Sequence, residues 1–544
     1  MTETPKTPAA EAKPDELSAR LAAVTTERDT LKTERDTYRK LYLDTLAQVH
    51  MLEVGVVGRG RERDLGADTQ TSMSLLALMM GVKEEPAAPA SPPAPPSKVK
   101  EHERAKPTGR QVLPEKLPRI DVEVLPPEVQ ARGTDAFEKI GEDVVETVER
   151  RPASLVVVRV HKPKFVEKGR DLDHEVKVRQ AESPELPIER GLAGPALLAD
   201  TIVRRWADHL PLHRLERIYG RDGLELARST VCGWHFDLAA LVRPLVEAMW
   251  KDAFLAPYLC VDATGVLVQE LEKCRTAHFF VVASPERHVL FGYSPKHNNA
   301  AVDALLEGYR GYLVADAHAV YDHLYLDGSI IEAACNSHSR RYFFKALSTD
   351  PVRARKAIAD YRLLFQIERK IAKEPPEKRR EIRQRESKPV FDALDEWCDR
   401  EALLVVDESP ISKAIRYEQN HRDALRRFLD DGRLPITNNW SERELRREAV
   451  GRKNWIFLGS DEGGQTNATF VSLIASCQLH GIEPAAYLRD LLCLLPGWKM
   501  SKVLELSPLH WRETSAREDV RAALAANVYR RASLGEFEPT PKAK

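Results

Sequence analysis

The stretch Tyr258-Leu-Cys-Val-Asp-Ala-Thr264 decides the fold, because it places one carboxylate, Asp262, inside an otherwise apolar strand. A second stretch, Gly311-Tyr-Leu-Val-Ala-Asp316, ends another apolar strand on a carboxylate. Burying a carboxylate on such a strand is costly unless it is paired or bound to a metal. The two stretches therefore predict a sheet in which two strands carry a functional pair of aspartates, although a lone strand-end aspartate more often caps a turn.

The segments around these stretches predict an ordered set of strands and helices. Strand patterns cover 257–268, 276–284, 288–293, 312–315 and 330–335, and a helical pattern covers 299–309. Three strands, a helix and then further strands are the order of an α/β ribonuclease-H-like sheet. In that topology the first and fourth strands are neighbours, so we expect Asp262 and Asp316 to meet.

A third carboxylate, Glu442, lies in Asn438-Asn-Trp-Ser-Glu-Arg443 on a predicted Arg-rich helix. Carboxylate oxygens are the ligands that hard Mg²⁺ ions prefer. Two such ions can clamp the attacking and leaving oxygens of a phosphodiester displacement. The three carboxylates therefore predict a two-metal site for phosphodiester chemistry. Glu442 could also bridge Arg446 four residues later on a helix surface, a role that does not exclude metal binding.

Basic residues near these carboxylates predict contacts with nucleic-acid phosphates. Arginine forks bind phosphate bidentately. The candidates are His338, Arg340 and Arg341 after the fifth strand, and Arg443, Arg446, Arg452 and Lys453 near Glu442. For the first three, a solvated basic turn is an equal alternative. Trp440 and Trp455 are candidates for base stacking, with core packing favoured for Trp455.

Residues 339–435 have a helical pattern without strand periodicity and separate Asp316 from Glu442. We expect an all-α insertion within the catalytic fold. Residues 340–388 hold 16 Lys and Arg against 7 Asp and Glu, a local formal charge of +9. This balance favours sequence-independent DNA contact, with Arg379, Arg380, Arg383 and Arg385 as the densest cluster; a solvated helical surface is the alternative.

The N-terminal half predicts several smaller parts. At seven-residue steps from Leu17 to Leu52 the residues are Leu, Val, Leu, Tyr, Thr and Leu, which favours a coiled coil and hence a homo-oligomer. An imperfect companion stripe leaves a solvated helix as the alternative. Residues 84–117 are rich in Pro and Ala and then charged, residues 118–182 contain β-rich stretches, and 210–234 could form a helix-turn-helix.

Bulk composition narrows the class of protein. The 544 residues carry a formal charge of −1, so any basic surface is local. The seven cysteines, an odd number, show no Cys-x-x-Cys spacing, which indicates reduced thiols. No apolar run approaches 18 residues. We expect a cytoplasmic, nucleoid-associated protein with no membrane span, and no zinc, because no Cys lies between 61 and 231.

Six long blocks, in order, make the chain resemble the IS66 family of insertion-sequence transposases (TnpC type). They are Val261–Thr264, Ala315-Asp-Ala-His-Ala-Val-Tyr-Asp322, Cys335-Asn-Ser-His-Ser-Arg-Arg341, Asn438–Arg446, Gly451-Arg-Lys-Asn-Trp-Ile-Phe-Leu-Gly-Ser460 and Gly481–Asp490. The N-terminal heptads and the stretch Leu192–Trp234 also resemble this family.

This resemblance implies a DDE transposase that cuts and joins DNA. Asp262, Asp316 and Glu442 would be its catalytic and metal-binding residues, and two Mg²⁺ ions its cofactors, with Mn²⁺ as a substitute. Its partners would be double-stranded DNA, both transposon ends and target, and accessory proteins of the same element.

The chain departs from the family at three places. The zinc-module position, 118–182, has no Cys, and Ala263 and Thr437 replace the usual acidic residues. The alternative function is therefore a catalytically decayed relic that binds element ends without cutting. A nonspecific nuclease is a weaker third option, because it would not need the coiled coil.

Together these patterns predict nine parts. They are an N-terminal region with the coiled coil at 15–52 (1–83), a linker (84–117), a β-rich module (118–182), a helical module (185–250), the first part of the core (251–338), the basic helical insertion (339–436), the second part of the core with Glu442 (437–480), a C-terminal transposase motif (481–500) and a tail (501–544).

Overall fold

The computed structural model describes residues 28, 113–115, 117–151, 154–167, 178–189 and 191–538. The predicted coiled coil and linker lie outside these residues, apart from Arg28 and the end of the linker. The described chain forms two compact units. One contains 339–372 and 385–419, and the other contains the remaining segments from 113 onward. In the part of the chain that is described, no helix is long and apolar enough to cross a membrane.

A small sheet lies within residues 119–180, where the sequence contains β-rich stretches. Strands β2 (Phe137–Arg151) and β3 (Ser154–Glu167) form a long antiparallel hairpin, and β1 (Arg119–Glu123) pairs with β3 in parallel. The short β4 (Arg179–Gln180) pairs with the other end of β3. Alternating valines of β3, Val156, Val158 and Val160, are buried against Tyr529 of helix α19 (Val528–Ser533), because successive strand residues point to opposite faces.

Three helices connect this sheet to the larger one. They are α4 (Pro195–Trp206), α5 (Leu212–Arg221) and α6 (Arg228–Ala253). Helices α5 and α6 overlap the predicted helix-turn-helix, but α6 runs for 26 residues, far beyond the predicted end at Trp234. Glu149 of β2 lies fully buried at the start of α4, where it accepts the Leu197 backbone N–H at 2.8 Å. Burial raises the pKa of Glu149 to about 8.

The larger sheet has the strands that the sequence predicts. They are β5 (Tyr258–Val268), β6 (Arg275–Ser284), β7 (His288–Ser294), β8 (Gly311–Ala315) and β9 (Ile330–Ala334), in the order β7-β6-β5-β8-β9. The first three are antiparallel neighbours, and β5, β8 and β9 are parallel. A short β10 (Phe457–Leu458) pairs with the end of β5.

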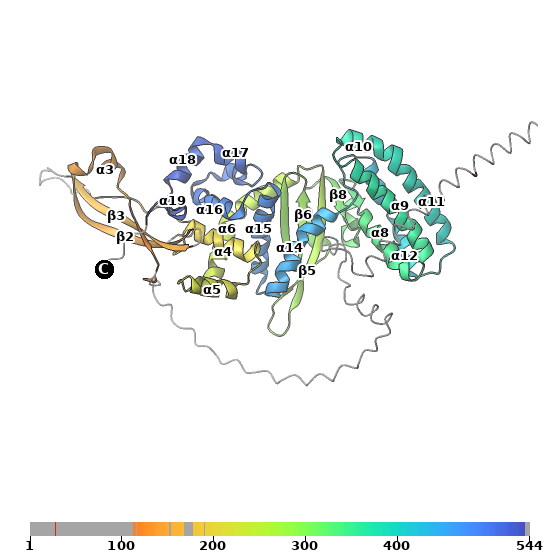
Figure 1. Cartoon of the computed structure of the whole chain (residues 1–544), viewed down its shortest axis with the longest axis horizontal. Helices are drawn as coiled ribbons and strands as arrows, with labels where there is room; N and C mark the ends of the chain where they lie inside the picture. The colour runs from red at the N-terminus through yellow and green to blue at the C-terminus, as the bar shows by residue number, and fades with distance from the viewer. Residues whose placement is uncertain are drawn as a thin grey trace, which may run out of the picture. The chain divides into compact units, whose positions relative to one another are not determined.

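Helices cover both faces of this sheet. Helix α7 (Asn299–Leu306) and the 3₁₀ segment Ala319–Tyr325 form an apolar cluster with Val261, Phe280 and Val282. Helix α14 (Asn439–Trp455) contacts β5 and β6 and lies beside these two strands in Figure 1. Tertiary packing of this kind stabilises an amphipathic helix more than its propensity does.

Helix α15 (Asp461–Leu479) covers the outer edge of β7. The Ser472 and Ser476 hydroxyls accept the backbone N–H groups of Phe291 and Val289 at 2.7 and 3.1 Å. An edge strand otherwise leaves such groups without sheet partners. The two serines therefore close this edge of the sheet.

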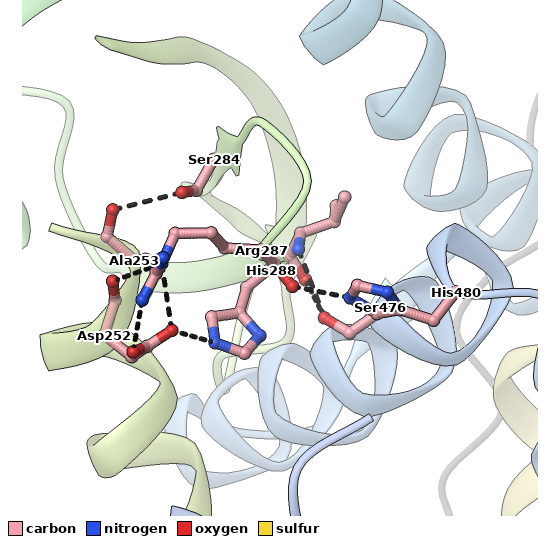
Figure 2. A network of polar contacts seen from close by, with 8 residues as sticks. Asp252, Ala253, Ser284, Arg287, His288, Ser476 and His480 are labelled. Atoms are coloured by element: carbon pink, nitrogen blue, oxygen red, sulfur yellow. Dashed lines mark hydrogen bonds and ion pairs between the residues drawn. The ribbon is translucent and has the colours of Figure 1, made fainter. Parts of the chain in front are cut away.

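A buried polar network reinforces that contact (Figure 2). The Asp252 carboxylate at the end of α6 accepts hydrogen bonds from Arg287 at 2.7 Å and from His288 at 2.9 Å. His480 donates to the Arg287 carbonyl at 2.8 Å. Burial alone would raise the pKa of Asp252, but the bonds from His288 and Arg287 outweigh it and lower the pKa to about 2. These bonds join the end of α6 to the start of β7 and to the residue that follows α15.

Residues 339–436 are helical, as predicted. The helices are α8 (Asn336–Lys345), α9 (Pro351–Lys370), α10 (Pro376–Ile382), a π-helical turn (Arg383–Ser387), α11 (Lys388–Ala402), α12 (Pro410–Asn420) and α13 (Arg422–Arg426). In the helical unit, the buried Glu418 accepts the Tyr361 hydroxyl at 2.5 Å. The C-terminal helices are α16 (Pro484–Leu494), α17 (Trp511–Ala516), α18 (Glu518–Ala526) and α19.

Candidate functional site

The two predicted aspartates occupy equivalent positions in the register of neighbouring parallel strands. Strands β5 and β8 pair through Leu259 with Leu313 and through Cys260 with Val314. Asp262 lies two residues beyond Cys260, and Asp316 lies two residues beyond Val314. The carboxyl ends of parallel strands meet at one edge of a sheet. The expected adjacency of the two strands is therefore confirmed, and both carboxylates are half-buried.

Asp262 faces the side of the sheet on which α14 lies. Its neighbours Val261 and Ala263 both pack into the apolar cluster with α7. Because side chains alternate along a strand, Asp262 points to the opposite face. Its Oδ1 accepts the Ala263 backbone N–H at 2.8 Å, which orients the carboxylate.

Hydrogen bonds hold helix α14 against β5 near both ends of the helix. The Asn438 amide, just before the helix, donates to the Val261 carbonyl at 2.8 Å. Near the other end, Arg452 donates to the Thr264 hydroxyl at 2.9 Å and to the Gly265 carbonyl. These contacts bracket Asp262 along the strand. Glu442 lies in the first turn of α14, near the Asn438 end.

The charges of both aspartates affect the buried Tyr321. Burial raises the pKa of its phenol, and the negative charges of Asp316 and then Asp262 raise it further. Both carboxylates therefore raise the pKa of the same tyrosine, as expected for two groups at one edge of the sheet. Ala317, which follows Asp316, has a left-handed backbone with φ of 55°. Such a conformation costs a non-glycine residue roughly 1–2 kcal/mol and often marks functional sites.

One group of potential metal ligands within the described residues contains Glu442. It consists of Cys335, His338 and Glu442, whose ligand atoms all lie within 4.8 Å of one another. Within this group, His338 Nε2 lies 3.7 Å from Glu442 Oε1. Neither Asp262 nor Asp316 belongs to this group. The metal site formed by all three predicted carboxylates therefore stays a prediction.

A group of three histidine rings, which includes His318 shortly after Asp316, was not predicted. The ring of His297 stacks at 5.0 Å on His278 and lies at 5.0 Å from His318. Burial lowers the pKa of His297, and the two neighbouring histidines lower it further, while Asp316 opposes them. Only His318, two residues after Asp316 in the chain, gave a sequence signal. His278 and His297 come from other strands and loops, so the sequence could not associate them.

The predicted DNA-contacting residues have different surroundings. Arg443, Arg446 and Lys453 are exposed and share one face of α14, because they lie three and ten residues apart. Arg452 is half-buried against β5 and contributes to structure. On α8, His338 and Arg340 are half-buried and Arg341 is exposed. The exposed face of α14 is therefore the better candidate for phosphate contact.

Arg383 does not fit the predicted basic DNA surface. Its side chain is fully buried. Its guanidinium donates to the carbonyls of Phe428 at 2.7 Å and of Asp431 and Leu434 at 3.0 Å. The grouping of Arg383 with exposed Arg380 and Arg385 was wrong, because three main-chain carbonyls more than 40 residues away already occupy it.

Trp455 has the packing role that was favoured for it. It is half-buried, and the guanidinium of Arg205 lies 5.4 Å from its ring centroid. Arg205 also lies 5.8 Å from the ring of Trp206. Burial lowers the pKa of Arg205 to about 10, and Glu448 on α14 opposes that effect. The contact therefore joins α4 to α14.

Comparisons with known proteins give the chain a family. The family model described as Transposase IS66 family matches residues 190–466, and the one described as IS66 C-terminal element matches residues 472–509. Relatives include three uncharacterized proteins of Sinorhizobium fredii. Protein y4hP is 29% identical over 86% of this chain and 88% of its own length. Protein y4qI is 31% identical over 75% and 78%, and y4jD is 30% identical over 74% and 81%. Because the first model alone spans more than half of the 544 residues, the chain belongs to the IS66 family of transposases.

Proposed function

We propose that this protein is a DNA transposase that cleaves phosphodiester bonds at the ends of its mobile element and joins them to target DNA. The observation that carries the proposal is the level position of Asp262 and Asp316 on the paired strands β5 and β8. The fastening of α14 beside Asp262 supports Glu442 as the third carboxylate.

We further propose that the larger sheet is a ribonuclease-H-like core. Its support is the order β7-β6-β5-β8-β9, with three antiparallel strands followed by two parallel ones. In this proposal the helices of 339–436 are an insertion between β9 and α14, the element that carries Glu442.

The donor set fits hard divalent ions. Asp262, Asp316 and Glu442 offer only carboxylate oxygens, which suit Mg²⁺ and the substitute Mn²⁺. All three are half-buried, so solvent and substrate can reach them. When bound, two such ions would activate the attacking oxygen and stabilise the leaving one.

The other residues have supporting roles. Arg443, Arg446 and Lys453 would bind phosphates on the exposed face of α14 and give affinity without reading sequence. Asn438 and Arg452 hold α14 to the backbone of β5 and so keep Glu442 in place. His338 lies 3.7 Å from Glu442 and would orient its carboxylate.

The test is cleavage of a DNA fragment that carries the native element end, with and without Mg²⁺. We expect Asp262→Asn, Asp316→Asn and Glu442→Gln each to abolish cleavage while end binding persists. The matched control is Asp322→Asn, an exposed carboxylate six residues after Asp316, which should cut normally. Wild-type protein that binds ends but never cuts would favour the decayed relic, and a variant that cuts at the wild-type rate would remove its residue from the site.

A further inference from the structure

We propose that Cys335, His338 and Glu442 form a binding site for a thiophilic divalent cation of the Zn²⁺ class. Their three ligand atoms lie within 4.8 Å of one another. They come from three places in the fold: the residue after β9, the first turn of α8 and the first turn of α14. This proposal goes against the expectation that no zinc is bound, which rested on the spacing of the seven cysteines and on the absence of Cys between 61 and 231.

The backbone fixes these three positions. The Cys335 N–H donates to the Ala315 carbonyl at 3.1 Å, and the His338 N–H donates to the Cys335 carbonyl at 3.0 Å. The Cys335 sulfur in turn accepts the Asn438 N–H at 3.1 Å, four residues before Glu442. The thiol is fully buried, whereas His338 and Glu442 remain partly accessible, with side-chain exposures of 19% and 26%. An ion could thus enter from the side of these two residues.

The mixture of donors selects the kind of ion. Thiolate is a soft ligand and imidazole a borderline one, and both suit Zn²⁺ or Co²⁺, whereas Mg²⁺ takes oxygen ligands. Three protein ligands with a fourth open position are typical of accessible zinc sites. Nitrogen and oxygen ligands at about 2.0–2.2 Å from a tetrahedral ion lie roughly 3.4 Å apart. The observed 3.7 Å between His338 and Glu442 needs only a small adjustment.

The site shares Glu442 with the carboxylate site of the proposed function, and the following consequence rests on that function. A carboxylate that coordinates a soft ion beside Cys335 is withheld from the Mg²⁺ ions near Asp262 and Asp316. Binding releases the thiol proton to solvent, because the ligand is the thiolate. Zn²⁺ is therefore expected to inhibit cleavage by competing for Glu442.

The direct test uses Co²⁺ and the full-length protein after removal of metals by a chelator. We expect one equivalent of Co²⁺ to produce a sulfur-to-cobalt charge-transfer band. Cys335→Ser should lose the band, and His338→Gln and Glu442→Gln should bind Co²⁺ at least tenfold more weakly. Cys274→Ser removes an exposed thiol and Cys398→Ser a buried one outside the group, and both should keep the band.

Thermal unfolding shows whether each variant is folded, and His338→Gln leaves intact the sulfur that accepts the Asn438 N–H. The absence of a band in the wild type, a band that persists in Cys335→Ser, or unweakened binding by folded His338→Gln would overturn the site. This readout needs no DNA cleavage, so it stands even if the proposed function fails. In Mg²⁺-dependent cleavage, Zn²⁺ should inhibit the wild type at least tenfold more strongly than His338→Gln, each relative to its own rate. Equal inhibition would refute the competition for Glu442.

Discussion

Replacing Arg383 by methionine should destabilise the protein strongly, although this arginine lies in the most basic part of the sequence. Methionine keeps much of the aliphatic length and removes the guanidinium. The carbonyls of Phe428, Asp431 and Leu434 would lose their donors in a place that water does not reach. The guanidinium also lies 5.0 Å from the ring centroid of Phe428, and that contact would be lost as well.

The size of the effect follows from these contacts. A hydrogen bond to a charged group contributes about 1.5–3 kcal/mol, and an acceptor left buried without a donor costs a similar amount. The three bonds share one side chain, so their energies do not add. Removing the charge also relieves its burial cost. We therefore expect a loss of about 3–5 kcal/mol, a large fraction of the roughly 5–15 kcal/mol that stabilises a typical domain.

Urea unfolding and hydrogen exchange together measure this loss. Exchange should accelerate in the segment around 428–434, which the guanidinium joins to the π-helical turn after α10. Arg380→Met is the matched control, because Arg380 is exposed three residues earlier, on α10. Surface changes usually stay within about 0.5 kcal/mol. If Arg383→Met were as stable as Arg380→Met, with unchanged exchange in this segment, the structural role assigned to Arg383 would be wrong.

Three further predictions concern stability and DNA affinity. Glu149 has a pKa of about 8 in the folded protein and 4.5 in the unfolded chain, so the free energy of unfolding should fall by up to about 5 kcal/mol as pH rises from about 4.5 to 8. Glu149→Gln should reduce this pH dependence in urea unfolding, and an unchanged pH dependence would contradict the prediction. Asp252→Asn should lower the unfolding free energy by about 2–3 kcal/mol, because Arg287 and His288 lose an anionic acceptor; melting at the wild-type temperature would argue against this. Replacing Arg443, Arg446 and Lys453 by Gln should reduce the log–log salt slope of DNA binding by roughly 0.9 for each lost phosphate contact, and an unchanged slope would place the DNA elsewhere.

The strands of the larger sheet could be predicted because each is a short apolar run between turns. The apolar runs around Asp262 and Asp316 predicted that both segments are strands, and the order of the elements predicted that these strands are neighbours. Ends were harder to predict: the helix expected over 299–309 stops at Leu306. Nothing in the sequence marked Ser472 and Ser476 as the groups that close the edge of β7, because serines in a helix carry no periodic signal.

The candidate site could be predicted only in part, because its parts are far apart in the sequence. Cys335 and His338 are visible as a Cys-x-x-His spacing, but their approach to Glu442 depends on how α14 docks on the sheet. Arg383 shows the opposite failure. A basic cluster in a sequence indicates a solvated face, and only the fold reveals that one of its members points inward.

The placement of Ala263 bears on whether the family's departures imply decay. Ala263 packs into the apolar cluster with α7, on the face opposite Asp262. An acidic side chain at that position would therefore point away from α14 and Glu442, so its replacement by alanine removes no carboxylate from their side of the sheet. The contacts that fasten α14 also do not involve the Ala263 side chain, because Asn438 and Arg452 bind Val261, Thr264 and Gly265. Ala263 is thus a weak argument for a catalytically decayed protein, and the decision rests on the cleavage measured with intact Asp262, Asp316 and Glu442.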